Sequence, residues 1–363
     1  MRGLAIGIMS GTSLDGADAI LADLSMHPPR GIATSFVPFP DDLKGRLLEL
    51  SAPGGDSLDA AGACSVQLAE IYADAVGRLL AEAAIPASDV EVIGCHGQTV
   101  RHRPELGYTI QLNDAARLAE RTGIDVVADF RRRDIAAGGQ GAPLVPVFHD
   151  AVFRHDALHR AIVNIGGISN VTSLRPGQAV SGFDCGPGNV LMDAWIKHHR
   201  GADYDEGGSW ASEGRVDPGL LGRLMKEPFF AKMPPKSTGR ELFNDAWLGT
   251  RLDERCAPAD VQATLLELTA TTIVDAVDRF CGAPDEIYLC GGGARNRRLA
   301  SRIGELASPR LVDTTDALGL PTGHVEAMAF AWFAVKCLRR EAIDLASVTG
   351  AGHACILGAI YPA

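Results

Sequence analysis

Residues 5–23 limit the possible folds of this 363-residue chain more than any other segment. An apolar run, a turn rich in Gly, Ser and Thr, and a second apolar run predict two strands joined by a hairpin. Gly7, Gly11 and Gly16 permit positive φ and leave no Cβ in the way of a ligand. Successive backbone N–H groups and hydroxyls in such a turn can bind an anion such as phosphate. An ordinary glycine hairpin fits the same residues, so this segment alone leaves both interpretations open.

Length and composition indicate a globular chain with a sizeable core, since hydrophobic residues make up 46% and charged residues 22%. We expect two domains at this length. The net charge of −11 argues against a general nucleic-acid binder, which needs a basic surface. No apolar run approaches the roughly 18 residues of a membrane span, and the first residues make a poor signal peptide. The eight scattered cysteines contain no CxxC pair, so they fit a reducing cytoplasm and suggest neither a zinc site nor a thioredoxin-type motif.

Apolar periodicity predicts strands that alternate with helices, which favours an α/β fold with mainly parallel sheets. The two halves share a plan of strand, glycine turn and strand, with hairpins at Gly11 and Gly167. We therefore expect a duplicated fold with a ligand between domains 1–140 and 141–363, the last residues being free to return to the first domain. The predicted strands are 3–9, 17–23, 31–38, 90–95, 108–112, 125–128, 160–164, 170–174, 179–184 and 286–290, and the predicted helices are 58–84, a helix capped by Asn113 that ends at Arg121, 261–281 and 325–340.

Four glycine-rich turns directly follow apolar strands, after Met9, Ile165, Asp184 and Cys290. One such turn is weak evidence, but four suit a nucleotide, because several backbone loops can share its phosphates, ribose and base. The chain has neither a GxxxxGK[ST] P-loop nor a dinucleotide-binding GxGxxG in the right context.

Two carboxylates are candidates for chemistry. Asp184 ends a predicted strand and precedes a Gly-Pro-Gly turn, where it can act as a general base at the mouth of a cleft. The alternative is an N-cap of the following helix, a position that favours Asp. Glu326 opens an apolar helix, where it either complements the helix dipole or faces a substrate.

Polar residues also follow two other apolar strands. His96 either donates to a sugar hydroxyl or an oxyanion, or is satisfied by neighbouring backbone. Arg131, Arg132 and Arg133 come directly after Asp129 and one intervening Phe. A guanidinium can bind a carboxylate through two hydrogen bonds, and we expect at most one or two of the three to point inward. A solvated charged turn is the alternative.

Several motifs in chain order resemble those of the anhydro-N-acetylmuramic acid kinase family. They run from about residue 5 to the end of the chain, and the combined set is highly specific although each motif alone is not. The motifs are residues 7–18, 95–99, 138–143, 164–170, 183–189, 237–244, 290–296 and 325–330.

The resemblance implies the two-domain actin-like ATPase fold of sugar kinases, heat-shock chaperones and actin, with an interdomain cleft that closes on ATP. It implies ATP-dependent phosphorylation of the 6-oxygen of 1,6-anhydro-N-acetylmuramic acid while water opens the anhydro ring, giving N-acetylmuramic acid 6-phosphate in cell-wall recycling. Asp184 would activate the water, Glu326 would assist near the anomeric carbon, and His96, Asp129 and Arg131 would lie around the sugar. The expected nucleotide-binding residues are Gly11, Thr12, Ser13, Leu14, Asp15, Gly16, Ala17, Asp18, Gly166, Gly167, Asn170, Gly291, Gly292, Gly293 and Asn296.

Other interpretations stay open at this point. A kinase for an ordinary reducing sugar would use Asp184 to deprotonate a free hydroxyl, and an ATP-gated binding module would make no sugar product. Asp15, Asp18 and Asp184 are candidate Mg²⁺ ligands, directly or through water. We expect a cytoplasmic homodimer that binds a small anhydro amino sugar and ATP, and neither nucleic acid nor membrane.

Overall fold

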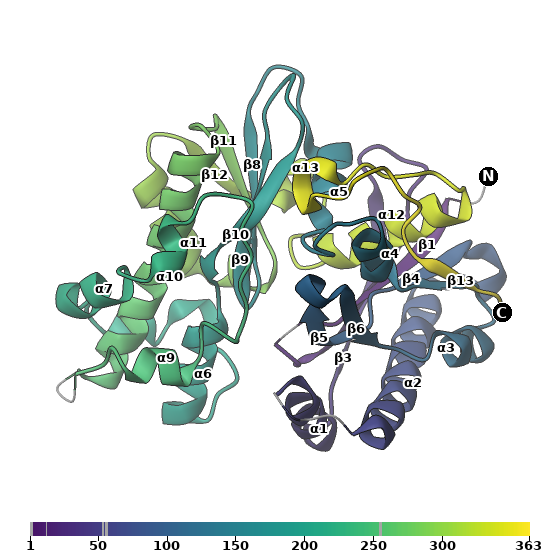
Figure 1. Cartoon of the computed structure of the whole chain (residues 1–363), viewed down its shortest axis with the longest axis horizontal. Helices are drawn as coiled ribbons and strands as arrows, with labels where there is room; N and C mark the ends of the chain where they lie inside the picture. The colour runs from purple at the N-terminus through teal and green to yellow at the C-terminus, as the bar shows by residue number, and fades with distance from the viewer. Residues whose placement is uncertain (1–2, 12, 53, 55–56, 254–255) are drawn as a thin grey trace. The chain divides into compact units, whose positions relative to one another are not determined.

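The computed structural model describes residues 3–11, 13–52, 54, 57–253 and 256–363, coloured along the chain in Figure 1. Thr12, which the hairpin prediction includes, lies outside the described residues. The chain divides into two compact units. Unit 1 comprises Met1–Val152 and Gly319–Ala363, and unit 2 comprises Phe153–Leu318.

Unit 1 is built on a six-stranded mixed sheet in the order β13-β7-β4-β1-β2-β3. The β1–β2 and β2–β3 pairs are antiparallel, β1, β4 and β7 run parallel, and β13 is antiparallel to β7. A separate two-stranded sheet pairs β5 with β6. The strands are β1 (Leu4–Met9), β2 (Gly16–Asp23), β3 (Arg30–Pro38), β4 (Val92–Cys95), β5 (Gln98–Arg103), β6 (Tyr108–Leu112), β7 (Val126–Ala128) and β13 (Ala359–Tyr361).

Helices cover both faces of this sheet. Side chains alternate between the two faces of a strand, so Ile6 and Ile8 point to the opposite side from Gly7. Ile6 and Ile8 share one buried cluster with Leu68 and Tyr72 of α2, while Gly7 faces the backbone of α12. The helices of unit 1 are α1 (Asp41–Ser51), α2 (Leu58–Ala83), α3 (Ala115–Thr122), α4 (Phe130–Ala136), α5 (Val145–Phe153, which ends at the unit boundary), α12 (Val325–Leu338) and α13 (Ala346–Thr349), with 3-10 turns at Ala87–Asp89 and Pro104–Leu106.

Unit 2 is built on a five-stranded sheet in the order β10-β9-β8-β11-β12, against which the long helix α10 packs. The strands are β8 (Arg160–Ile165), β9 (Ile168–Leu174), β10 (Ser181–Pro187), β11 (Glu286–Cys290) and β12 (Leu311–Thr314). The helices are α6 (Val190–Arg200), α7 (Pro218–Leu224), α8 (Pro228–Ala231), α9 (Asp245–Gly249), α10 (Pro258–Phe280) and α11 (Arg297–Ala307), with 3-10 turns at Glu206–Gly208, Ala211–Glu213, Gly292–Arg295 and Thr315–Leu318.

The two sheets have the same strand plan, as the duplication hypothesis predicts. In unit 1 the order β3-β2-β1-β4-β7 joins two antiparallel pairs to two parallel pairs. In unit 2 the order β10-β9-β8-β11-β12 does the same. The β1–β2 hairpin therefore corresponds to the β8–β9 hairpin.

A close contact between backbone segments fixes α12 on the unit 1 sheet. Gly7 of β1 and Gly94 of β4 are register partners on adjacent parallel strands. A Cβ at Gly7 would overlap the carbonyl oxygen of Ala327, and a Cβ at Gly94 would overlap that of Phe330. These two glycines let the helix backbone lie directly against the strands, because any side chain there would force it away.

This contact explains why the compact units differ from the division at residue 140. The carboxyl-terminal segment belongs to unit 1 because α12 packs on β1 and β4, and β13 pairs with β7. A buried hydrogen bond from Thr349 Oγ1 to Asp134 Oδ1 at 2.7 Å adds a further link. The first segment of unit 1 also continues past residue 140 to Val152.

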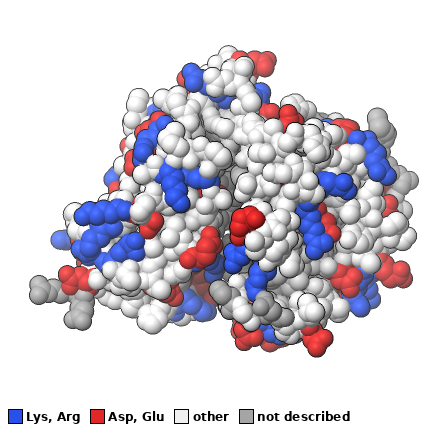
Figure 2. Space-filling view, viewed as in Figure 1, with Lys and Arg blue, Asp and Glu red and all other residues white. Residues whose placement is uncertain are grey.

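Acidic and basic side chains are interspersed on the face of the molecule that Figure 2 shows. Among the described residues, no helix is both long enough and apolar enough to cross a membrane.

We predict that Gly94→Ala lowers the free energy of unfolding by roughly 1–3 kcal/mol, because the added methyl group must displace the backbone of α12. The measurement is chemical denaturation followed by fluorescence. Gly77→Ala is the matched control, since Gly77 lies exposed in α2 with open space where a Cβ would lie, and alanine there favours the helix by up to about 1 kcal/mol. Equal denaturation midpoints for the two variants would contradict the proposed packing constraint.

Candidate active site

The β1–β2 turn of unit 1 is shaped by its own hydrogen bonds. Leu14 adopts a left-handed conformation with φ of 60°, and its N–H donates to the Gly11 carbonyl at 3.3 Å. The same carbonyl accepts from Gln98 Nε2 at 3.2 Å. Asp15 Oδ1 accepts from Ser13 Oγ at 2.8 Å and from the Gly16 N–H at 3.0 Å. These hydrogen bonds join the described residues of the turn to one another and to Gln98 of β5.

Gly16 and Gly11 of this hairpin differ in what a side chain at each position would meet. A Cβ at Gly16 would overlap the Val37 carbonyl oxygen of the neighbouring strand, so the fold itself requires glycine there. A Cβ at Gly11 would meet Ser13 Oγ only at 3.6 Å. Among the described residues of unit 1, the chain neighbours of Gly11 aside, no atom other than those of Ser13 lies within 4 Å of that Cβ position, which leaves room for a ligand to approach the backbone.

Two carboxylates of unit 1 lie near the start of α12. Asp18 follows Ala17 in β2, and its Oδ1 lies 4.0 Å from His324 Nε2. His324 directly precedes α12, and the half-buried Glu326 lies in the first turn of that helix. The close packing of α12 against β1 and β4 therefore sets where these side chains lie.

His96 makes hydrogen bonds through both ring nitrogens. Its Nδ1 lies 2.6 Å from the Gly97 carbonyl oxygen, and its Nε2 accepts from Arg131 Nε at 2.8 Å. Only a neutral ring protonated on Nδ1 can satisfy both contacts. Burial, together with the nearby Arg131 charge, lowers the pKa of His96 well below its usual range, which supports the same state. The histidine therefore orients Arg131, whose Nη1 also donates to the Gly141 carbonyl at 2.8 Å.

The three consecutive arginines have different surroundings. Arg131 is partly buried against His96, whereas Arg132 and Arg133 are exposed. Arg132 Nε lies 3.6 Å from Asp129 Oδ1. Asp129 itself has a left-handed backbone, with φ of 62°, directly before α4, and Tyr361 Oη lies 3.5 Å from its Oδ2. Of the three, Arg131 is the one whose orientation is fixed by the interior.

In unit 2, strand register brings polar residues together at one end of the sheet. Asp184 of β10 is the register partner of Asn170 of β9, and Asn170 is the partner of Asn164 of β8. Register partners on adjacent strands place their side chains on the same face. The structure therefore aligns Asp184 with Asn170, which the sequence motifs link only by resemblance.

Asp184 lies within β10, and α6 begins only at Val190 with Asn189 at its N-cap. The N-cap alternative for Asp184 is therefore wrong. The Asp184 N–H donates to the Lys236 carbonyl at 3.1 Å, and Asp184 Oδ2 accepts from the Thr238 N–H at 2.9 Å. A β-bulge follows between Asp184 and Gly186. The carboxylate is half-buried, and a segment outside the sheet fixes its orientation.

The two glycine turns next to Asp184 support each other. The N–H groups of Gly188 and Asn189 donate to the carbonyls of Gly167 and Gly166, both at 2.9 Å. A Cβ at Gly188 would overlap the Gly166 carbonyl oxygen. At Gly166 itself a Cβ would meet only the Ile168 carbonyl oxygen at 3.5 Å, so its outer side is open like that of Gly11.

In the loop after β11, some residues pack against the protein and one faces open space. A Cβ at Gly291, whose φ is 83°, would overlap Asn164 Oδ1, and a Cβ at Gly293 would overlap the Ile165 side chain. Gly292 is exposed, with the nearest atom 4.0 Å from a Cβ. Asn296 caps α11, since its Oδ1 accepts from the Leu299 N–H at 3.1 Å. Gly292 is thus the position of this loop most open to a ligand.

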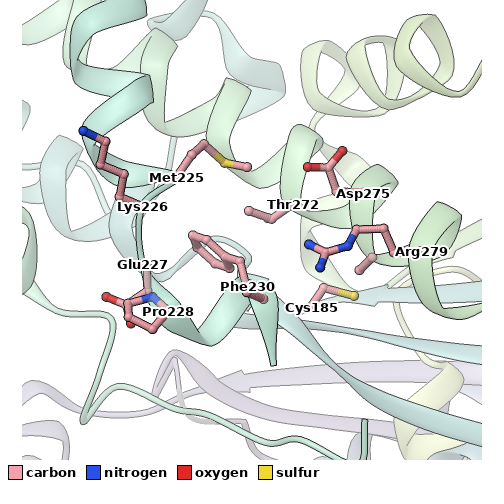
Figure 3. A pocket seen from close by; sticks show the side chains of 11 residues that line it. Cys185, Met225, Lys226, Glu227, Pro228, Phe230, Thr272, Asp275 and Arg279 are labelled. Carbon is pink, nitrogen blue, oxygen red and sulfur yellow. The ribbon is translucent and has the colours of Figure 1, made fainter. Parts of the chain in front are cut away.

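A small cavity of about 180 Å³ lies within unit 2 beside β10 (Figure 3). Cys185, Phe230, Thr272 and Arg279 are among its lining residues, which Figure 3 labels. Burial raises the pKa of the Cys185 thiol well above its usual range, so it is a poor nucleophile.

In the part of the chain that the structure describes, no three His, Cys, Asp or Glu side chains are grouped so as to hold a metal ion. That arrangement is compatible with Mg²⁺, which usually keeps several waters and binds through one or two carboxylates and substrate phosphates.

Sequence reasoning does not assign roles to Asn164, Lys236 or Thr238. Thr238 lies in the motif 237–244, but its contact with Asp184 spans 54 residues of sequence and depends on a backbone N–H. No residue type signals such a contact. Asn164 stands out only after the strand register is known.

Comparison with known proteins gives a match over the whole chain. A family model described as "Anhydro-N-acetylmuramic acid kinase" matches residues 3–363. The anhydro-N-acetylmuramic acid kinase of Nitrosomonas europaea is 52% identical over 360 residues, covering 99% of this chain and 99% of that protein. The enzyme of the same name from Bordetella petrii is 53% identical over 367 residues, covering 99% of this chain and 96% of that protein.

Among solved structures, component A of (R)-2-hydroxyglutaryl-CoA dehydratase from Acidaminococcus fermentans matches with a TM-score of 0.50. The match covers 92% of this chain and 98% of that one at 12% sequence identity, so it concerns the fold alone. The predicted actin-like ATPase fold is confirmed.

We predict that the His96 ring stays neutral, with its proton on Nδ1, in the pH range around 6.5 where an ordinary histidine titrates, because burial and Arg131 disfavour the imidazolium form. Two-dimensional ¹⁵N–¹H NMR of [¹⁵N]histidine-labelled protein gives both tautomer and charge, and a His96→Gln variant assigns the signal. Protonation within this range, or a proton on Nε2, would contradict the hydrogen bond from Arg131.

Proposed function

The chain belongs to the anhydro-N-acetylmuramic acid kinase family, and we propose that it converts 1,6-anhydro-N-acetylmuramic acid, ATP and water to N-acetylmuramic acid 6-phosphate and ADP. The observation that carries this conclusion is the match of one family model to residues 3–363. The sugar acceptor and the opening of the anhydro ring follow from that membership.

Asp184 is the proposed general base. In the reaction, its carboxylate takes a proton from water as the water oxygen forms a bond to the anomeric carbon. The bond between that carbon and O6 breaks, and its electron pair stays on O6. The hydrogen bond from the Thr238 N–H to Oδ2 supports this role, because it holds the carboxylate in one orientation.

The released O6 needs no separate base. It develops alkoxide character as the anhydro bridge opens, and it attacks the γ-phosphorus while the bond to the ADP oxygen breaks. Phosphoryl transfer depends mainly on alignment and charge stabilisation. One proton acceptor can therefore serve both bond changes, and the proton leaves Asp184 for solvent after product release.

Backbone loops of both units are proposed to bind ATP. The Gly11–Asp18 hairpin would bind the phosphates, and the Gly166–Asn170 and Gly291–Asn296 loops would bind the rest of the nucleotide. The open space in front of Gly11, Gly166 and Gly292 supports this assignment. Asn296 would act through its loop, since its side chain caps α11.

Asp15, Asp18 and Asp184 are the proposed carboxylates for Mg²⁺, directly or through water. Hard oxygen donors of this kind suit the ion. When bound, Mg²⁺ would neutralise charge on the phosphate oxygens. Asp15 also keeps the hairpin in shape through its bonds to Ser13 and Gly16.

The sugar is proposed to contact Arg131, Asp129 and Glu326. Arg131 would bind the lactyl carboxylate, because a guanidinium suits a carboxylate and His96 fixes its direction. His96 would thus contribute by positioning Arg131. Glu326 would lie near the anomeric carbon.

We further propose that the enzyme works in the cytoplasm as a homodimer, in the recycling of cell-wall sugars, with no nucleic-acid or membrane partner. The family resemblance supports these assignments, and sedimentation at several protein concentrations tests the dimer.

We predict that Asp184→Asn lowers turnover by about 10²–10⁴-fold, because the amide cannot accept the proton from water. The dissociation constant for ATP, measured by calorimetry, should change by less than about threefold. Retained turnover would remove Asp184 from the mechanism.

The wild-type enzyme gives a direct test of the reaction in ¹⁸O-water with ATP, Mg²⁺ and the anhydro sugar. Rapid quenching and mass spectrometry should find one heavy oxygen at the anomeric carbon and none in the phosphate. A kinase for reducing sugars would accept N-acetylmuramic acid without such labelling, and a binding module would form no sugar phosphate.

We predict that Arg131→Ala raises KM for the anhydro sugar about tenfold or more, because a charge-assisted hydrogen bond contributes roughly 1.5–3 kcal/mol. KM for ATP should stay nearly constant. Arg133→Ala is the matched control, as Arg133 is exposed in the same helix. Equal KM values for both variants would exclude Arg131 from sugar binding.

A further inference from the structure

Lys236 is a buried cation in unit 2 with an unusual environment. The residue is only 9% exposed. The ammonium lies 4.8 Å from the ring centres of both Phe229 and Phe280 and 5.8 Å from that of Phe183. It also donates to the carbonyls of Phe229 and Phe230 at 3.4 Å. Among the described residues, no carboxylate forms an ion pair with it.

Burying the Lys236 ammonium costs solvation free energy, so the presence of a lysine at this position requires an explanation. A charge removed from water loses several kcal/mol of solvation unless other groups compensate. Here aromatic faces and carbonyl dipoles provide partial compensation. Burial still lowers the pKa of Lys236, whereas the nearby Cys185 and Asp184 oppose that shift.

The backbone around Lys236 makes the contacts that orient Asp184. The Lys236 carbonyl accepts from the Asp184 N–H, and the Thr238 N–H donates to Asp184 Oδ2. The side chain of Lys236 donates instead to carbonyls of α8, those of Phe229 and Phe230. One short segment is therefore attached to α8 at one side and to Asp184 at the other.

Little else holds this segment. Residues 232–239 contain no helix or strand, and Ser237 is exposed. In the described part of the chain, every hydrogen bond that ties 233–238 to the rest of unit 2 involves Lys236 or Thr238. The cavity in Figure 3 borders Phe230, so packing leaves space on that side of α8.

We propose that Lys236 is a positioning residue for the reaction: its ammonium fixes segment 234–238 to α8 and the phenylalanine rings, so that the Thr238 N–H holds the Asp184 carboxylate toward the attacking water. This inference rests on the proposed role of Asp184 as the base. It assigns to Lys236 no contact with substrate.

The substitution Lys236→Met tests whether Lys236 affects kcat through positioning rather than through the stability of the fold. Methionine keeps an unbranched apolar stem but removes the charge and both hydrogen bonds. Replacing a buried charge by an apolar side chain is often neutral or stabilising. We therefore expect an unchanged or higher unfolding temperature, a kcat lowered at least tenfold, and KM values for ATP and sugar within about threefold. Lys236→Arg should recover much of kcat, because a guanidinium can stack on the same rings and donate to the same carbonyls.

Lys232→Met is the matched control. Lys232 is exposed and directly follows α8, just before the segment, with Nζ 6.0 Å from the Phe229 ring centre, and no hydrogen bond or ion pair joins it to Asp184 in the described structure. Its removal should leave kcat within about twofold. An equal fall in kcat for Lys232→Met would mean that the local charge matters rather than the attachment, and would overturn the proposal.

Hydrogen exchange provides a readout that does not depend on catalysis. In Lys236→Met, but not in Lys232→Met, peptides that contain the Thr238 amide should exchange faster. Unchanged protection, or full kcat in Lys236→Met while Asp184→Asn is inactive, would overturn the inference alone. Full turnover in Asp184→Asn would instead overturn the proposed role of Asp184. Should Lys236→Met fold poorly, Lys236→Gln is measured by the same exchange and kcat criteria.

Discussion

The backbone contact of α12 with β1 and β4 determines most of the candidate site in unit 1. It exists because Gly7 and Gly94 are register partners and neither has a side chain to separate helix from sheet. This contact positions the start of α12, and with it His324 near Asp18 and Glu326 in the first turn. Further along the same helix, the Phe330 ring packs 4.7 Å from the His96 ring, between ring centres. A packing constraint in the core thus fixes the positions of buried and half-buried polar groups.

Unit 2 orients its proposed base in a different way. Strand register places Asp184 beside Asn170, but register alone does not fix the direction of a carboxylate. The Thr238 N–H donates to that carboxylate, and the segment that contains Thr238 is attached to α8 through the buried Lys236. The arrangement accepts an energetic cost, a cation among phenylalanine rings, at a place where apolar residues would pack more favourably. Costs of this kind are expected near functional groups rather than in a neutral part of a core.

Helices and strands that bury a periodic apolar face can be predicted from the sequence. Features that depend on contacts between distant segments cannot. The strand at 3–9 and the helix at 58–84 agree with β1 and α2 to within a residue or so because their apolar patterns are continuous. The expected cap at Asn113 is wrong, since the side chain of Asp114, one residue later, accepts from the Arg117 N–H. Sequence patterning does not reveal β12, because it is an edge strand without fully buried residues. Asp184 is recognisable from its place at a strand end, but the groups that hold it come from a distant segment whose composition predicts only a loop.

The two sheets share a strand plan, but their corresponding glycine turns differ. Both units present a glycine turn after the first strand of an antiparallel pair, but the turn between Met9 and Gly16 is longer than that between Ile165 and Ile168. The longer turn has several backbone N–H groups and hydroxyls to surround an anion, whereas the short turn is fixed by the N–H groups of the β10–α6 connection. In the second sheet the register partners Asn164, Asn170 and Asp184 form a polar row across three strands that ends in a carboxylate. The shared strand plan therefore gives two corresponding turns that differ in length and in strand-end residues, and these differences agree with the separate roles proposed for them, phosphate binding in unit 1 and proton transfer in unit 2.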